Sequence, residues 1–186
     1  MKHVIFSILL VGLCSLAYGQ PAGQTVASKT LVAYFSCSGN TAQAAKTLAE
    51  ATQGTLFEIK AAQPYTAADL DYRNRQCRSI VEMGDPKARP EIAAKVEQWN
   101  SFSTVYIGFP IWCDAAPRII NTFLESYDFS GKTVIPFVTS GSSPIDHSAS
   151  ALKTSYPQIS WKQGMRLNNM TAEQIKTWSG SQASGQ

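Results

Sequence analysis

The sequence predicts a doubly wound α/β fold, in which a five-stranded parallel sheet carries helices on both faces. Its strand-like segments are continuous apolar runs, as expected of strands that are buried on both sides. Helical patterns separate these segments, which favours parallel strands joined by crossovers. The chain has 186 residues, of which 44% are hydrophobic and 16% charged, so a single domain with a sizeable core is expected.

The strands are expected over residues 31–35, 56–59, 104–109, 133–138 and 159–165. Pro136 lies inside the fourth segment and cannot donate to a sheet ladder, which counts against an uninterrupted strand there. Ligands of such folds bind beyond the carboxyl ends of the strands, where the strand order reverses. The loops after the first, third and fourth strands are therefore the candidate site.

Helices are expected over residues 41–53, 67–83, 91–100, 116–126, 145–155 and 171–178. The third of these patterns places Ile92, Val96 and Trp99 at i, i+4 and i+7 behind Pro90, a residue suited to a helix start. The stretch 60–90 is longer than an ordinary connection, and such excursions are usually functional lids or surface decoration.

The start of the chain has the pattern of a secretory signal. Lys2 precedes an apolar run, and Ala17 and Gly19 place small residues where a signal peptidase cuts. A first core element, or a lipid anchor at Cys14, is the alternative. The expected organisation is a signal peptide (1–19), a mature N-terminal segment (20–28), one domain (29–179) and a flexible tail (180–186). Export, to a periplasm or to the medium, is therefore predicted.

Charge and hydropathy narrow the partners. A net charge of +3, spread along the chain, does not point to nucleic acid. No apolar run reaches the length of about 18 residues that a transmembrane helix needs. The sequence also lacks a Ser-His-Asp set, paired carboxylates and a metal-spaced cluster of His and Cys, so no metal is expected and no catalytic residue is assigned.

The first candidate loop is built to accept a phosphate. It consists of Ser36, Cys37, Ser38, Gly39, Asn40 and Thr41. Backbone N–H groups at a helix start are unpaired, and the helix dipole favours negative charge there. The loop has neither the lysine of a Walker motif nor three spaced glycines, which disfavours ATP and NAD. Ser and Asn are also ordinary caps and turn formers, so a purely structural role stays open.

The other two loops suit a planar ring. Pro110, Ile111, Trp112 and Cys113 follow the third strand, and Thr139, Ser140 and Gly141 follow the fourth. An indole in a presumed loop suits stacking on a flat ligand, and a hydroxyl-rich turn suits its polar edge. The alternatives are an indole that folds back over the sheet edge as packing, and a plain surface loop.

The three loops together resemble those of the flavodoxin-like flavoproteins. Residues 31–41 resemble that family's first strand and its loop for the phosphate of FMN, residues 108–118 its second flavin loop, and residues 136–141 its third. The resemblance runs from about residue 29 to 167. It departs after Trp112, where relatives tend to have an aromatic residue, a glycine and an acidic residue; here Cys113, Asp114 and Ala115 follow.

The resemblance implies an FMN held without a covalent bond, which passes electrons to a redox partner protein or a small electron acceptor. An FMN-dependent reductase of a quinone, or a flavin-free binding module on the same fold, is the alternative. Cys37 lies at a helix start, which predicts a favoured thiolate. Cys37 and Cys113 could form a redox pair; the alternative is that both are small residues with a packing role only. Arg118 is expected in a surface salt bridge.

Overall fold

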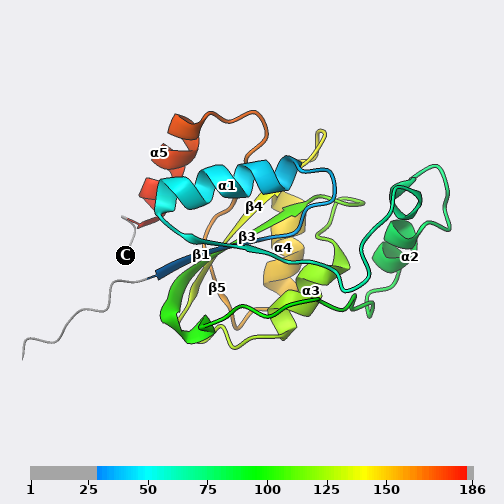
Figure 1. Cartoon of the computed structure of the whole chain (residues 1–186), viewed down its shortest axis with the longest axis horizontal. Helices are drawn as coiled ribbons and strands as arrows, with labels where there is room; N and C mark the ends of the chain where they lie inside the picture. The colour runs from blue at the N-terminus through cyan, green and yellow to red at the C-terminus, as the bar shows by residue number, and fades with distance from the viewer. Residues whose placement is uncertain (1–28, 184–186) are drawn as a thin grey trace, which may run out of the picture.

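A computed structural model describes residues 29–183 of the chain. The predicted signal peptide (1–19) and mature N-terminal segment (20–28) lie outside the described residues. The described part is a parallel sheet between two layers of helices, with one excursion, around α2, at the end of the molecule (Figure 1).

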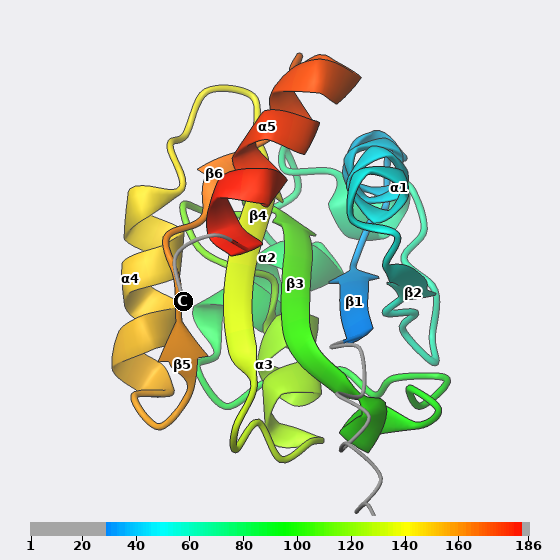
Figure 2. The same cartoon turned by 90° about the vertical axis from the view of Figure 1, so that its left-hand side faces the viewer.

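The sheet follows the predicted doubly wound topology. Its strands are β1 (Lys29–Tyr34), β2 (Thr55–Glu58), β3 (Phe102–Pro110), β4 (Thr133–Thr139), β5 (Ser160–Trp161) and β6 (Met165–Arg166). They pair in the order β2-β1-β3-β4-β5, all parallel, and β6 also pairs with β4 (Figure 2). The order reverses at β1, so the loops after β1 and β3 flank the switch point, as the predicted fold class requires.

Helices cover both faces. They are α1 (Asn40–Thr52), α2 (Arg78–Gly84), α3 (Arg118–Glu125), α4 (Asp146–Ser155) and α5 (Ala172–Ala183). Two short 3-10 helices span Ala68–Leu70 and Trp99–Ser101. Helices α1 and α5 lie on one face of the sheet, and α3 and α4 on the other (Figure 1).

Alternate strand residues supply two separate cores. Val32, Tyr106 and Phe137 pack with α1 and α5 in one cluster. Leu31 and Val105, their neighbours along the strands, pack with α3 and α4 in the other. Because both faces of β1, β3 and β4 are buried, their sequences read as continuous apolar runs.

The helix predicted over residues 91–100 is wrong. Only the 3-10 turn at its end is helical, and each of its three large apolar residues makes a contact with a residue outside the segment. Ile92 lies in an isolated antiparallel bridge, and the backbone N–H of Val96 donates to the Tyr127 hydroxyl at 2.7 Å. Trp99 stacks on the Tyr127 ring at 4.4 Å. Spacing alone cannot separate such anchors from a helical stripe.

The helix predicted over residues 67–83 is also shorter than expected. It is a 3-10 turn followed by α2, with an irregular stretch between them. In that stretch the Asp71 carboxylate accepts the Arg73 backbone N–H, and the Asn74 side chain accepts that of Gln76. Short polar side chains that bind nearby backbone groups in this way compete with a helix.

Pro136 is accommodated by a break in the neighbouring strand. The carbonyls of Val134 and Val138 accept hydrogen bonds from Lys162 and Leu167, so this side of β4 faces β5 and β6. By the alternation of a parallel strand, Pro136 faces the same side, and its missing N–H falls in the gap between β5 and β6. The predicted strand over 159–165 is therefore two short strands.

Helix α5 extends beyond its predicted end at residue 178. It continues to Ala183, so residues 180–183 are helical where a flexible tail was expected. The Lys162 ammonium donates to the backbone oxygen of Gln182 at 2.6 Å, and the Ser181 hydroxyl donates to that of Trp178. The first of these bonds satisfies a carbonyl of the last turn that has no helical partner.

Candidate functional site

A cleft of about 400 Å³ lies at the carboxyl edge of the sheet, where the three predicted loops meet. Eight predicted residues line it: Ser38, Asn40, Pro110, Ile111, Trp112, Thr139, Ser140 and Gly141. Tyr72 and Asn168 complete the lining, and none of these side chains is charged. The other predicted residues, Ser36, Cys37, Gly39, Thr41 and Cys113, belong to the same loops without lining the cleft.

The loop after β1 leaves the start of α1 open. Gly39 is the residue that caps this helix, with φ of 86°, and no side chain bonds to the first turn. A β-carbon at Gly39 would meet nothing within 4 Å, so the left-handed backbone rather than crowding favours glycine here. The Ser36 hydroxyl accepts the Gly39 backbone N–H at 3.2 Å and shapes the bend. The first amides of α1 are therefore available to an anion.

A buried hydroxyl pair joins the first loop to the third. The hydroxyl oxygens of Thr41 and Thr139 lie 2.7 Å apart, and both side chains are buried. One hydroxyl donates to the other, so the accepting hydroxyl keeps an O–H that this bond does not use. The pair fixes the start of α1 against the end of β4, so two walls of the cleft are held in register.

The loop after β3 makes a tight hairpin turn. Trp112 and Ala115 exchange both backbone hydrogen bonds, at 3.0 and 2.9 Å. Cys113 and Asp114, between them, have φ of 47° and 62°. Positive φ at both central residues is the conformation of a type I′ turn, which usually contains glycine or asparagine. Non-glycine residues thus take the backbone shape that glycine would adopt most easily.

His147 ties this turn to α4. Its Nδ1 lies 2.9 Å from the backbone oxygen of Asp114 and 3.1 Å from the Asp114 carboxylate. Both side chains are exposed. The contact reaches from the first turn of α4 to the left-handed turn after β3, so it links the mouth of the cleft to a rigid helix.

The Trp112 indole lies mostly in the core, because only 6% of the residue is exposed. It packs edge-on against Phe35 and Tyr65, at ring distances of 5.5 and 5.3 Å. The indole therefore forms a wall of the cleft, and its stacking on a ligand stays a prediction. Tyr72 is the exposed aromatic ring of the lining, at 49%, and burial of its hydroxyl raises the pKa to about 12.

The excursion that carries Tyr72 is pinned by a charged cluster. The Tyr65 hydroxyl and the Arg78 side chain donate to the two oxygens of Glu82, at 2.5 and 2.6 Å. The Arg78 guanidinium also lies 4.0 Å from the centre of the Tyr65 ring. Arg118 donates to the backbone oxygens of Glu82 and Met83, so it holds the end of α2 rather than a carboxylate. The predicted surface salt bridge of Arg118 is therefore wrong.

Asn168 is a lining residue that the sequence reasoning missed. Its side-chain oxygen accepts the Ser140 backbone N–H at 2.8 Å and so fixes the third loop. Asn168 follows β6, and the carboxyl end of any strand of this sheet meets the same edge. Its position after the last strand was the available signal. A second hollow, of about 470 Å³, shares Asn40, Thr139 and Asn168 with the cleft and continues it toward α5.

The three described cysteines, Cys37, Cys77 and Cys113, are free thiols. Desolvation raises the pKa of Cys37 to about 11, and the nearby Arg78 offsets this only in part. The direction of this shift is opposite to the favoured thiolate expected at this helix start, and desolvation is its main cause. Among residues 29–183, no cluster of metal-ligating side chains is found. None of the helices in that range has the length and hydropathy to cross a membrane.

Comparisons with known proteins agree with this geometry. The family model described as Flavodoxin matches residues 29–182. The chain is 52% identical to a candidate flavoprotein from Bacteroides eggerthii DSM 20697, with a TM-score of 0.82 over 84% of this chain and 98% of that one. It is 55% identical to another from Bacteroides uniformis ATCC 8492, with a TM-score of 0.80 over 82% and 98%.

A flavoprotein in complex with FMN, from Lactobacillus acidophilus NCFM, shares the fold at 24% identity and a TM-score of 0.67, over 82% of this chain and 99% of that one. No curated protein matches the chain. The family match covers nearly all of the described residues and includes the three loops of the cleft. The chain belongs to the flavodoxin family.

Proposed function

We propose that the chain binds FMN non-covalently in the carboxyl-edge cleft and transfers electrons to a redox partner protein or a small acceptor. The observation that carries this proposal is the start of α1, which has no side-chain cap and no acidic residue in its first turn. A phosphate accepts hydrogen bonds from such amides without a lysine or arginine. The FMN complex of the Lactobacillus acidophilus relative supports the choice of ligand.

The residues of the cleft fit the parts of FMN. The amides from Asn40 onward, with the Ser38 hydroxyl, would hold the phosphate, and Tyr72 and Ile111 would flank the ring. Thr139 and Ser140 line the cleft, and their hydroxyl oxygens, although engaged within the protein, can still accept hydrogen bonds from the edge of the ring. Bound FMN supplies the capacity to accept and release electrons, and no charged side chain of the lining faces the ring.

The decisive test is to compare FMN with riboflavin, which lacks the phosphate. We expect FMN to lose fluorescence on binding and to bind at least about tenfold more tightly than riboflavin, because charge-assisted bonds to the phosphate contribute about 1.5–3 kcal/mol. Equal affinities would show that the start of α1 does not hold the phosphate. A protein that takes up neither flavin would favour the flavin-free binding module.

A reductase of a quinone or a similar acceptor is the second candidate. The observation that favours it is the place of Tyr72, which comes from the excursion and lines the cleft that a substrate would enter. Steady-state oxidation of a nicotinamide cofactor with a quinone by the FMN-loaded protein would support this activity. Electron exchange with a protein partner, without turnover of the small acceptor, would leave the carrier role alone.

We also propose that residues 1–19 direct export. The proposal rests on the positive residue, the apolar run and the small residues that precede Gln20. Expression of the full chain in a bacterium with a periplasm should yield an exported protein whose first residue is Gln20. An uncut protein retained in the cytoplasm would contradict the proposal.

A further inference from the structure

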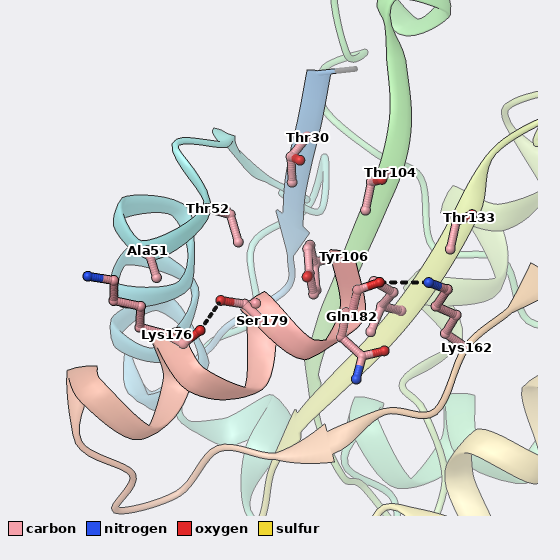
Figure 3. A pocket seen from close by; sticks show the side chains of 12 residues that line it. Thr30, Ala51, Thr52, Thr104, Tyr106, Thr133, Lys162, Lys176, Ser179 and Gln182 are labelled. Atoms are coloured by element: carbon pink, nitrogen blue, oxygen red, sulfur yellow. Dashed lines mark hydrogen bonds between the residues drawn. The ribbon is translucent and has the colours of Figure 1, made fainter. Parts of the chain in front are cut away.

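A further cavity, of about 540 Å³, lies at the opposite end of the sheet from the proposed flavin cleft. It opens between α1 and α5, on the sheet face that these two helices cover only in part (Figure 3). Side chains of β1, β3 and β4 form its floor, near the beginnings of the strands. The cavity shares no lining residue with the cleft, so it is a separate feature of the molecule.

The floor carries a row of threonines. Thr30 pairs in register with Thr104, and Thr104 pairs with Thr133 across the next strand. All three line the cavity and are partly exposed. Their hydroxyls have no hydrogen-bond partner in the described part of the chain. Adjacent strands lie about 4.8 Å apart, so the row presents regularly spaced hydroxyls to whatever enters.

Tyr106 lies at the centre of the floor, one row further along the strands. Only 3% of the residue is exposed, and its ring packs edge-on against Trp178 at 5.7 Å. Its hydroxyl makes no hydrogen bond within residues 29–183, although it lines the cavity (Figure 3). Desolvation raises the pKa of Tyr106 to about 12, which keeps this hydroxyl protonated. The hydroxyl oxygen is not among the fully buried atoms of residues 29–183 that lack a partner, so it faces the cavity, where water or a ligand can accept its hydrogen bond.

The charged side chains that line the cavity are both positive. The Lys162 ammonium faces the wall formed by α5, where it donates to the Gln182 backbone oxygen (Figure 3). That carbonyl carries no net charge, and neither Asp nor Glu belongs to the lining. Lys176 lines the mouth with its stem, and its ammonium points away past α1 (Figure 3). An anionic group in the cavity therefore meets Lys162 without competition from a carboxylate of the lining.

We propose that this cavity binds a small, polyhydroxylated organic anion. Its carboxylate would pair with Lys162, one of its oxygens would accept a hydrogen bond from the Tyr106 hydroxyl, and its hydroxyl groups would lie along the threonine row. The proposal is independent of the flavin cleft. It explains why polar threonines form this row of the sheet, whereas the next row along the strands carries the apolar side chains of Val32 and Ile135.

The test uses D-gluconate as the probe, followed by NMR of the ¹⁵N-labelled protein. We expect saturable shifts of the amides of residues 104, 106 and 133, and at least about tenfold weaker binding of uncharged sorbitol. Tyr106→Phe and Lys162→Gln should each weaken gluconate binding about fivefold. Lys153→Gln, on α4 at the other face, is the matched control and should leave binding unchanged.

The stability of Tyr106→Phe gives a second, independent readout. Because the hydroxyl has no partner to lose, the melting temperature without ligand should not fall. A clear fall would show that another group satisfies this hydroxyl and would overturn the proposal. Equal binding of gluconate and sorbitol, or gluconate binding that both variants leave intact, would overturn it as well. So would NOE contacts that place residues 20–28 or a second copy of the chain on Tyr106.

Discussion

The two ends of this sheet use the same residue types in opposite ways. At the carboxyl edge the hydroxyls are engaged by the protein: Thr41 bonds to Thr139, and Ser140 bonds to Ser143. At the other end the threonine row has no partner among residues 29–183. The engaged hydroxyls fix loops whose backbone amides then face a ligand, whereas the hydroxyls of the row are themselves available to one. Hydroxyl content alone therefore does not say which groups of a site do the binding.

One tyrosine at each end sharpens this contrast. Tyr72 is 49% exposed at the mouth of the carboxyl-edge cleft, and Tyr106 is 3% exposed on the floor of the other cavity. Desolvation raises the pKa of both hydroxyls to about 12. The first ring lies at the surface on the excursion, while the second lies on a central strand and packs against Trp178. We expect Tyr72 to contribute ring contact and Tyr106 a directed hydrogen bond.

The largest effect should come from Gly39→Ala. The substitution opposes the left-handed backbone that opens the start of α1, so the amides there lose their alignment. We expect FMN affinity to fall about 10- to 100-fold, measured by fluorescence titration, as charge-assisted bonds to the phosphate are lost.

Gly131→Ala is the matched control for this variant. Gly131 also has positive φ, at 72°, and open space around it, but it lies in the turn before β4. Both variants should lose about 1 kcal/mol of unfolding free energy, and only Gly39→Ala should lose FMN affinity. Equal affinities for the two variants would mean that the α1 start is not the phosphate site.

A smaller effect should appear at high pH from Tyr106. Its folded pKa of about 12 lies above the ordinary tyrosine value of 10.0, so the folded state holds this proton more tightly than the unfolded state. The resulting stability is fully present below pH 10 and is lost as the pH rises toward 12. Between about pH 9 and about pH 11, Tyr106 should account for about 1 kcal/mol of the fall in unfolding free energy.

Urea unfolding at both pH values measures this effect, with Tyr106→Phe as the comparison. The variant should lose less stability over the interval than the parent chain. Tyr72→Phe is the control at the other end, where solvent screening should make the difference smaller. A parallel decline of the parent chain and Tyr106→Phe would show that the phenol titrates normally.

The sequence was sufficient to predict the sheet and the edge of the sheet at which the cleft lies. Runs such as 31–35 and 104–109 are apolar because both faces of those strands are buried, and a short continuous apolar run between helical patterns is typical of a parallel sheet. The parallel order then placed the three loops together, and the cleft lies there. These features follow from local sequence and from topology rules that hold widely.

Tertiary contacts decided the rest. Residues 91–100 have helical spacing, yet Val96 and Trp99 contact Tyr127, which lies far along the chain. The orientation of the Trp112 indole likewise depends on Tyr65, a residue of the excursion. The cavity around Tyr106 depends on where α5 crosses the sheet, and no local sequence pattern in β3 predicts that position. Each of these features needs a partner that sequence spacing does not identify.

The smallest effect should come from the turn after β3. Cys113 has φ of 47° in an exposed position, so Cys113→Gly removes a left-handed strain at the cost of a more flexible unfolded chain. We expect a net gain of about 0.5 kcal/mol in unfolding free energy, measured in urea. Gln98→Gly, at φ of 51° in the chain before β3, is the matched control and should gain as much. Since the contacts of His147 and Ala115 with this turn are made to Asp114 and Trp112, which the substitution leaves unchanged, FMN affinity should change less than about twofold. A loss of stability in Cys113→Gly, set against a gain in Gln98→Gly, would mean that the thiol itself stabilises the edge of the cleft.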